Sequence, residues 1–169
     1  MKAEPNPGHY ALVKLEEWVR EVTILTQNID SLHRRAGSRD VVELHGNITR
    51  FKCFDNCLGN PTLIDLAGID HDSKHAPACP HCGSTIRPDV VWFGEALPAA
   101  ALERAVSVAS KCDVMLIVGT SGLVQPAASL PHVAREHGAL VIEINPEPSA
   151  ITPAASIFLQ GQSGQILPQ

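Results

Sequence analysis

The sequence predicts an α/β fold with a parallel sheet and an inserted small module. Three observations carry this prediction. Strand-like apolar runs alternate with helical patterns, the regular pattern stops between Gly46 and Asp89, and four of the five cysteines lie in that interval. Alternating strands and helices are typical of βαβ units, whose strands form a parallel sheet with right-handed crossovers.

The elements expected before the insert are two helices and two strands. Apolar residues at helical spacing follow a Pro-rich turn and predict a helix over 10–22. The run at 22–26 is β-branched and apolar on both faces, as expected of a strand in a covered sheet. A short helix that ends at Gly37 and a strand-like run at 41–46 follow.

Regularity returns after the insert. The expected elements are a helix at 98–112, a strand at 113–119, a helix at 126–138, and strands at 139–145 and 156–161. The second helix contains Pro131, which is unusual inside a helix. Since aromatic residues make up only 4% of the chain, aliphatic side chains are expected to fill the core.

Composition excludes several classes of protein. The chain of 169 residues carries a formal net charge of −5 and no Lys/Arg block, which argues against a nucleic-acid surface. No apolar run reaches the ~18 residues of a membrane span, and the first residues lack the apolar segment of a signal peptide. We therefore expect a soluble, cytoplasmic protein. Thiols stay reduced in the cytoplasm, so clustered cysteines indicate a metal before a disulfide.

The cysteines of the insert form two closely spaced pairs. These are Cys53 with Cys57 (C-x3-C) and Cys79 with Cys82 (C-x2-C). Two such turns can build a closed, tetrahedral, structural zinc site, which would stabilise a segment too poor in apolar residues to fold alone. Reduced loop thiols, an iron–sulfur site, or competition from His81 are the alternatives. Cys112 ends a helix alone and is interpreted as a small buried residue.

Polar residues follow three of the expected strands. Gln27, Asn28 and Asp30 follow the expected strand at 22–26. Gly119, Thr120 and Ser121 lie at the end of the strand at 113–119, and Asn145 ends the strand at 139–145. Ligands of open α/β sheets bind beyond the carboxyl ends of the strands, so these residues favour a nucleotide-sized polar ligand. The alternative is that they only cap the following helices. The usual G-x-G-x-x-G turn does not occur.

His45 lies after a strand and directly before the insert. A histidine can act as a general base near neutral pH. Taken alone, one histidine among eight is more simply interpreted as a surface or hydrogen-bonded residue.

The order of these motifs resembles one known family. "TQNIDSLHRRAG", "ELHG", the two cysteine pairs, "VVWFGE", "GTSGLVQPAA" and "EINPEPS" follow one another along essentially the whole chain. This pattern resembles the sirtuins, the NAD-dependent protein deacylases, and especially their bacterial and desuccinylase-type branch. The resemblance implies a truncated Rossmann-like NAD-binding domain at 1–45 and 93–169, with a zinc-binding module at 46–92.

The resemblance also implies residue roles. His45 matches the catalytic base. Residues around the nicotinamide and its ribose are matched by Gln27, Asn28 and Asp30. The loop at the NAD ribose and phosphates is matched by Gly119, Thr120 and Ser121. Asn145 matches a residue on the adenosine side, and Ser163 matches a position near the adenine. Val91, Phe93, Gly94 and Glu95 match the strand-like segment that pairs with an acyl-lysine peptide by β-augmentation. A plain core strand is the alternative for that segment.

The implied reaction is NAD-dependent lysine deacylation. The acyl oxygen attacks C1′ of the nicotinamide ribose, nicotinamide leaves, and an alkylimidate forms. His45 then accepts a ribose hydroxyl proton, so that this oxygen attacks the imidate and the acyl group ends on ADP-ribose. Zinc takes no part in this chemistry.

The sequence departs from the family pattern in several places. Three family motifs do not occur in this sequence: the Gly-Ala-Gly-x-Ser turn, the Gly-x-Pro-Asp-Phe-Arg loop, and the Tyr-x-x-Arg motif that marks a preference for acidic acyl groups. In the family pattern all three would precede Met1. Gln125 stands where relatives often carry tyrosine. We therefore expect either a truncated product of a longer enzyme, or a catalytically inactive, zinc-stabilised module that binds acyl peptides. ADP-ribosyl transfer to protein is a third interpretation.

Overall fold

The computed structural model describes residues 3–69 and 75–169, so residues 70–74 of the predicted zinc-binding module lie outside it. The chain forms two compact units. Unit 1 comprises the described residues up to Leu25 together with Leu32–Val42 and Ala100–Gln169, and unit 2 comprises Thr26–Ser31 and Glu43–Ala99. The predicted boundaries between an NAD-binding domain and a zinc-binding module, after residue 45 and after residue 92, stay a prediction.

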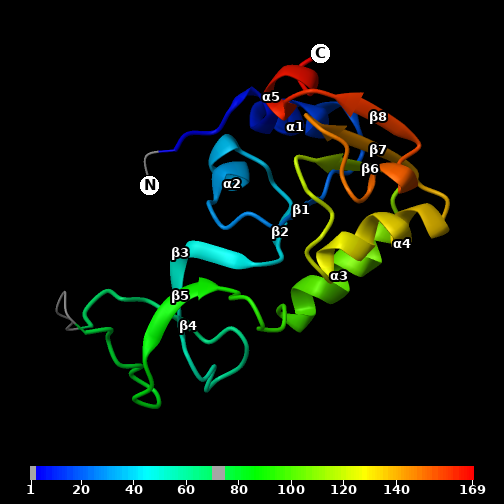
Figure 1. Ribbon diagram of the computed structural model, residues 1–169. Coiled ribbons are helices and arrows are strands. Elements are labelled where there is room, and N and C mark those ends of the chain that lie inside the picture. The colour runs from blue at the N-terminus through cyan, green and yellow to red at the C-terminus, as the bar shows by residue number, and fades with distance from the viewer. Residues whose placement is uncertain (1–2, 70–74) are drawn as a thin grey trace. The chain divides into compact units, whose positions relative to one another are not determined.

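Unit 1 is built on a parallel sheet of three strands in the order β6–β7–β8 (Figure 1). These strands are β6 (Val114–Val118), β7 (Leu140–Asn145) and β8 (Ile157–Gln160). The parallel pairing confirms the expectation from the alternating pattern. The core on one face joins Ile117 and Val141 of the sheet to Ile151 and Ala154.

The helices of unit 1 are α1 (Pro7–Trp18), α2 (Leu32–Ala36), α3 (Ala99–Ala109), α4 (Leu130–Glu136) and α5 (Ser163–Ile166). Short 3₁₀ turns lie at Ala127–Ser129 and Thr152–Ala154. Pro131 lies in the first turn of α4, where a missing N–H costs nothing. The predicted helix at 126–138 is therefore a 3₁₀ turn followed by a shorter α-helix.

The first helix begins earlier and ends earlier than the predicted range of 10–22. Asn6 caps α1 through its side chain, which accepts from the backbone N–H groups of Gly8 and His9, and Pro7 occupies the first helical position. Val19 already has extended backbone angles and closes the helix. Cap residues therefore set the helix ends, whereas the prediction followed apolar spacing alone.

Unit 2 contains an antiparallel sheet in the order β4–β3–β5. Its strands are β3 (Gly46–Cys53), β4 (Leu63–Ile64) and β5 (Ile86–Val90). The sequence predicts only irregular structure here. The register of β3 against β5 shifts between Asn47 and Phe51, so burial along β3 does not alternate and the usual strand pattern is hidden.

The remaining strands are β1 (Ile24–Thr26) and β2 (Val41–Glu43), which pair with each other. Both are shorter than the predicted ranges of 22–26 and 41–46. β2 ends at Glu43 because Leu44 and His45 form a turn that leads into β3. Among the described residues, no helix is long and apolar enough to cross a membrane.

Candidate functional site

The four cysteines of the insert come together in unit 2. All four Sγ atoms lie within 4.8 Å of one another. The sulfur of Cys53 is 3.5 Å from that of Cys82, and the sulfur of Cys57 is 3.9 Å from that of Cys79. A tetrahedral zinc ion with Zn–S bonds of about 2.3 Å separates its sulfurs by roughly 3.8 Å. The cysteines are therefore positioned to bind one zinc ion.

The thiols of this cluster differ in acidity. A hydrogen bond from the backbone N–H of Cys57 is the largest influence on Cys53, whose pKa is lowered to about 7. Loss of solvent around the sulfur, followed by the neighbouring thiols, raises the pKa of Cys57 to about 12. A metal bound here would replace the remaining thiol protons, so binding would release protons.

The cysteine cluster is also the core of this part of the chain. Cys53 and Cys79 are buried with Ile64 and Ile86, and the partly buried side chains of Phe51, Leu66 and Ile69 pack against them. An isolated bridge between Ala78 and Thr85 closes the turn that carries the second cysteine pair. Two of the four cysteines thus belong to this small core, whereas Cys57 and Cys82 are exposed.

His45 lies in the turn between β2 and β3, in unit 2. Its Nδ1 is 2.9 Å from the backbone carbonyl oxygen of Gln27, and its own carbonyl accepts from the N–H of Val91 at 3.0 Å. A carbonyl oxygen can only accept, so in the neutral ring Nδ1 carries the proton and Nε2 the lone pair. This tautomer is the one that a general base requires.

In unit 2, hydrogen bonds to the preceding strand and to β3 hold the loop that carries Gln27, Asn28 and Asp30. The hydroxyl of Thr26 accepts from the N–H of Asn28 at 3.1 Å, and the N–H of Ile48 donates to the carbonyl of Ile29 at 2.9 Å. The loop then turns through Ser31, whose φ of 63° lies in the left-handed region.

Asn47 holds this loop to β3 and was not singled out by sequence reasoning. Its amide donates to the hydroxyl of Ser31 and to the carboxylate of Glu43, both at 2.6 Å. Asn47 itself is buried. The available signal in the sequence was the position of Asn47 two residues after His45. An amide side chain so close to a candidate base must be hydrogen-bonded if it is buried.

The segment matched to peptide binding is a strand only as far as Val90. Trp92 to Glu95 form a turn: the N–H of Glu95 donates to the carbonyl of Trp92 at 3.0 Å, and Gly94 has a φ of 89°. Beyond Val90 the segment is therefore not paired as a strand, and its pairing with an acyl-lysine peptide stays a prediction. A plain core strand is wrong for this segment, since the side chain of Phe93 is fully exposed.

Arg87 holds this turn from the inside. Its Nη2 donates to both carboxylate oxygens of Glu95 at 2.8 Å, and the Glu95 carboxylate accepts from the N–H of Trp92 at 3.0 Å. The guanidinium lies 4.1 Å from the Trp92 ring centroid and 5.4 Å from that of Phe54. The hydrogen bond with Arg87 lowers the pKa of Glu95.

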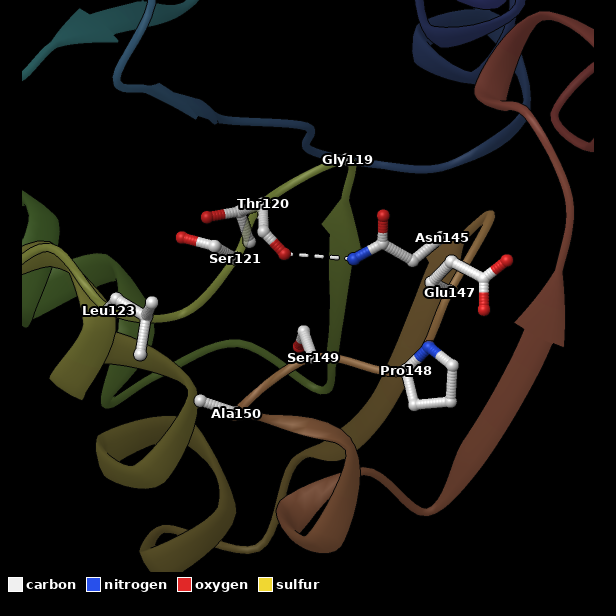
Figure 2. Close-up of a pocket in the computed structure, with 9 residues that line it drawn as sticks. All are labelled: Gly119, Thr120, Ser121, Leu123, Asn145, Glu147, Pro148, Ser149 and Ala150. Atoms are coloured by element: carbon white, nitrogen blue, oxygen red, sulfur yellow. Dashed lines mark hydrogen bonds between the residues drawn. The ribbon is translucent and has the colours of Figure 1, made fainter.

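A polar pocket of about 430 Å³ lies at the carboxyl ends of β6 and β7 in unit 1 (Figure 2). It is lined by Gly119, Thr120, Ser121, Leu123, Asn145, Glu147, Pro148, Ser149 and Ala150. The structure thus brings together four residues that sequence reasoning selected from two separate strand ends, as the rule for parallel sheets predicts. Their proposed contacts with NAD stay a prediction.

Ser163 is not part of this pocket lining. It is the first residue of α5, and its backbone carbonyl approaches Gly8 of α1 so closely that a Cβ added to Gly8 would lie 3.0 Å away.

Two carboxylates near this pocket were not selected from the sequence: Glu147 lines the pocket, and Glu143 lies buried beside Asn145. The signal was a carboxylate inside the apolar run "LVIEIN", because acidic residues are rarely buried without a specific partner.

Comparison with known proteins shows that this chain is similar to members of one family. The model of the Sir2 family matches residues 1–126. A relative named NAD-dependent protein deacylase, from Pyrococcus abyssi (strain GE5 / Orsay), is 52% identical over 170 residues, covering 100% of this chain and 68% of the relative.

Solved structures agree with the sequence relatives. A Sir2 homolog–NAD complex is 40% identical with a TM-score of 0.87, covering 99% of this chain and 63% of that one. A complex described as Sir2, p53 peptide and NAD+ is 34% identical with a TM-score of 0.86, covering 98% of this chain and 68% of that one. The chain therefore spans about two thirds of the length of these proteins.

Proposed function

Because this chain belongs to the Sir2 family, we propose that it acts as an NAD-dependent protein-lysine deacylase. The acyl group passes from a lysine side chain to ADP-ribose, nicotinamide and the free lysine amine are released, and one water molecule is consumed. The observation that carries the proposal is the hydrogen bond of His45 Nδ1 to the Gln27 carbonyl, which leaves Nε2 free as a base.

The residues present suit NAD. In unit 1, the loop at Gly119–Ser121 is assigned to the NAD ribose and phosphates, Asn145 to the adenosine side and Ser163 to the adenine. In unit 2, Gln27, Asn28 and Asp30 are assigned to the nicotinamide and its ribose. When bound, NAD supplies an electrophilic ribose carbon that accepts the acyl oxygen as nicotinamide leaves.

The chain's own acid–base work falls to His45. Its Nε2 accepts the proton of a ribose hydroxyl, and the proton on Nδ1 stays hydrogen-bonded to the Gln27 carbonyl, which keeps the ring from rotating. The positive charge that develops on the ring is stabilised by that same carbonyl dipole. A general base of this kind contributes about 10²–10⁴ to the rate.

The substrate we propose is an acyl-lysine segment of a protein. Val91, Phe93, Gly94 and Glu95 are assigned to it, and the exposed Phe93 side chain gives an apolar contact for the peptide or for the lysine stem. A zinc ion held by Cys53, Cys57, Cys79 and Cys82 stabilises unit 2 and touches no reacting atom.

The test is mass spectrometry of the purified chain with NAD and a set of acyl-lysine peptides. We expect O-acyl-ADP-ribose from the wild type and at least about a hundredfold less from His45→Ala. His137→Ala is the matched control, since His137 Nδ1 also pairs with a backbone carbonyl, that of Val133, at 2.9 Å and is exposed. It should keep full activity.

Folded, zinc-loaded wild type that gives no product would contradict the deacylase proposal. Peptide binding without product would favour the alternative of a non-catalytic acyl-peptide module. Transfer of ADP-ribose onto protein in place of the acyl product would favour ADP-ribosyl transfer.

A further inference from the structure

Two carboxylates of unit 2 are buried next to one shared cation. The side chain of Glu43, the last residue of β2, is 8% exposed, and that of Asp89, in β5, is 3% exposed. A buried carboxylate is costly unless a cation and hydrogen-bond donors compensate its charge. Since Glu43 lies two residues before His45, the groups that compensate it also bear on the position of the base.

Arg50 of β3 bridges the two carboxylates. Its Nη1 donates to Oε2 of Glu43 at 2.6 Å, and its Nε and Nη2 donate to Oδ2 of Asp89 at 3.2 and 3.0 Å. Burial disfavours the charged guanidinium, yet hydrogen bonds with Glu43 and Asp89 outweigh it and raise the pKa of Arg50. A guanidinium carries donors on several edges, so one side chain serves both acceptors at once.

One side of this bridge reaches the loop that follows β1. The other oxygen of Glu43, Oε1, accepts from Nδ2 of Asn47 at 2.6 Å. The Ser31 hydroxyl accepts from the same Nδ2 at 2.6 Å and donates to Oδ1 of Asn47 at 2.9 Å. The φ of 63° at Ser31 is costly for a residue with a side chain, so these contacts hold the turn in place. Arg50 thus acts on the end of this loop through Glu43 and Asn47.

The other side of the bridge reaches the end of β5. Gly46, with a φ of 76°, packs so tightly on the Asp89 carbonyl that a Cβ at this position would collide with it. Two residues after Asp89, the N–H of Val91 donates to the His45 carbonyl at 3.0 Å. The position of Asp89 therefore determines where the chain leaves β5 for the Trp92–Glu95 turn.

We propose that Arg50 is a positioning residue that couples two parts of the site in unit 2. These parts are the loop at 27–31, assigned to nicotinamide and its ribose, and the Trp92–Glu95 turn, assigned to the acyl-lysine peptide. The inference rests on the proposed deacylase function. Arg50 acts through Glu43 and Asp89, and the turn that carries His45 lies between the two parts it connects.

The test measures two Michaelis constants on folded, zinc-loaded protein. One is the KM of nicotinamide in the exchange of labelled nicotinamide into NAD at saturating peptide, and the other is the KM of the acyl-lysine peptide in product formation. Arg50→Met removes the bridge, while Asp89 keeps the Lys52 ammonium 3.7 Å away. Both constants should rise about fivefold, the size of one hydrogen bond. A merely smaller folded fraction would lower kcat and leave both constants unchanged.

Arg50→Lys keeps the charge but loses the forked donors, so it should also raise both constants, by less. Ser31→Ala removes the hydroxyl at the end of the loop and should raise only the nicotinamide constant. Combined with Arg50→Met it should raise that constant no further than the larger single change, because both break one chain of contacts. Arg39→Met is the matched control, since Arg39 pairs with the buried carboxylate of Glu16 in unit 1. It should leave both constants unchanged.

The outcomes separate this inference from the proposed function. A wild type that gives neither exchange nor product would overturn both. If the wild type is active and the Arg50 variants keep either constant at its wild-type value, the coupling role of Arg50 is overturned and the deacylase proposal stands. Additive effects of Arg50→Met and Ser31→Ala on the nicotinamide constant would also overturn it.

Discussion

The side chain of Arg87 links three groups of unit 2. It pairs with Glu95, lies over the ring of Trp92 and approaches the ring of Phe54, which directly follows Cys53. Only 8% of the Arg87 side chain is exposed. A buried guanidinium with a charged partner is costly to disturb, because the other charge is then left uncompensated. Arg87 therefore anchors the turn that presents Phe93.

Replacement of Arg87 by methionine should loosen this turn. We expect Arg87→Met to weaken acyl-peptide binding about tenfold, since Glu95 loses its partner and the N–H of Trp92 loses a fixed acceptor. Fluorescence titration with labelled peptide measures this change, and Arg87→Lys should recover part of it. ADP binding, which uses the unit 1 pocket, should not change. Unaltered peptide affinity in Arg87→Met would refute the anchoring role.

Burial opposes ionisation of Glu143, yet hydrogen bonds from Ser149, Thr152 and Asn145 outweigh it and lower the pKa of the carboxyl. This lowered pKa has a consequence for stability. A carboxyl whose pKa falls below its ordinary value of 4.5 on folding stabilises the protein above that pH and loses this contribution as the pH falls. The difference in unfolding free energy between wild type and Glu143→Gln should therefore be largest at pH 7 and shrink below about pH 4.5. Urea unfolding at a series of pH values measures it.

Both proteins of that comparison carry the same cysteine cluster, so acid loss of a bound metal affects them equally and cancels in the difference. A constant difference would mean that folding leaves the pKa of Glu143 unchanged, and a difference that grows on acidification would mean that folding raises it.

At the level of elements, the two sheets depend on different kinds of core. The sheet β6–β7–β8 packs on apolar side chains alone, whereas the core of the sheet β4–β3–β5 includes Cys53 and Cys79 beside its apolar residues. Metal removal should therefore affect the second sheet far more than the first.

Chelation should release one zinc ion per chain and abolish amide-exchange protection in β3 and β5, with β6–β8 still protected. Cys53→Ser should give the same result, because one missing thiolate opens the site. Cys112→Ser is the matched control, since the Cys112 thiol donates to the Ala109 carbonyl and lies outside the cluster. Equal loss of protection in both sheets would contradict separate cores.

The same contrast explains which elements the sequence could predict. The strands β6, β7 and β8 begin and end within a residue or so of their predicted limits, because each is a short, mostly apolar run bounded by polar or turn-forming residues. β3 was missed because its irregular register hides the alternation. The cysteine ligands followed from spacing alone, but the roles of Glu143 and Arg87 depend on contacts that only the folded chain reveals.

For the whole molecule, each unit carries one part of the proposed chemistry. Unit 1 holds the polar pocket, and unit 2 holds His45, the cysteine cluster and the Trp92–Glu95 turn.

The most direct test of this chemistry is isotope exchange of labelled nicotinamide into NAD, measured beside O-acyl-ADP-ribose formation. Because His45 is proposed to act after nicotinamide has left, exchange by His45→Ala should continue while its product falls at least about a hundredfold. Exchange by the wild type should require an acyl-lysine peptide. Exchange without peptide, no exchange at all, or an equal loss of exchange and product in His45→Ala would contradict the proposed role of His45.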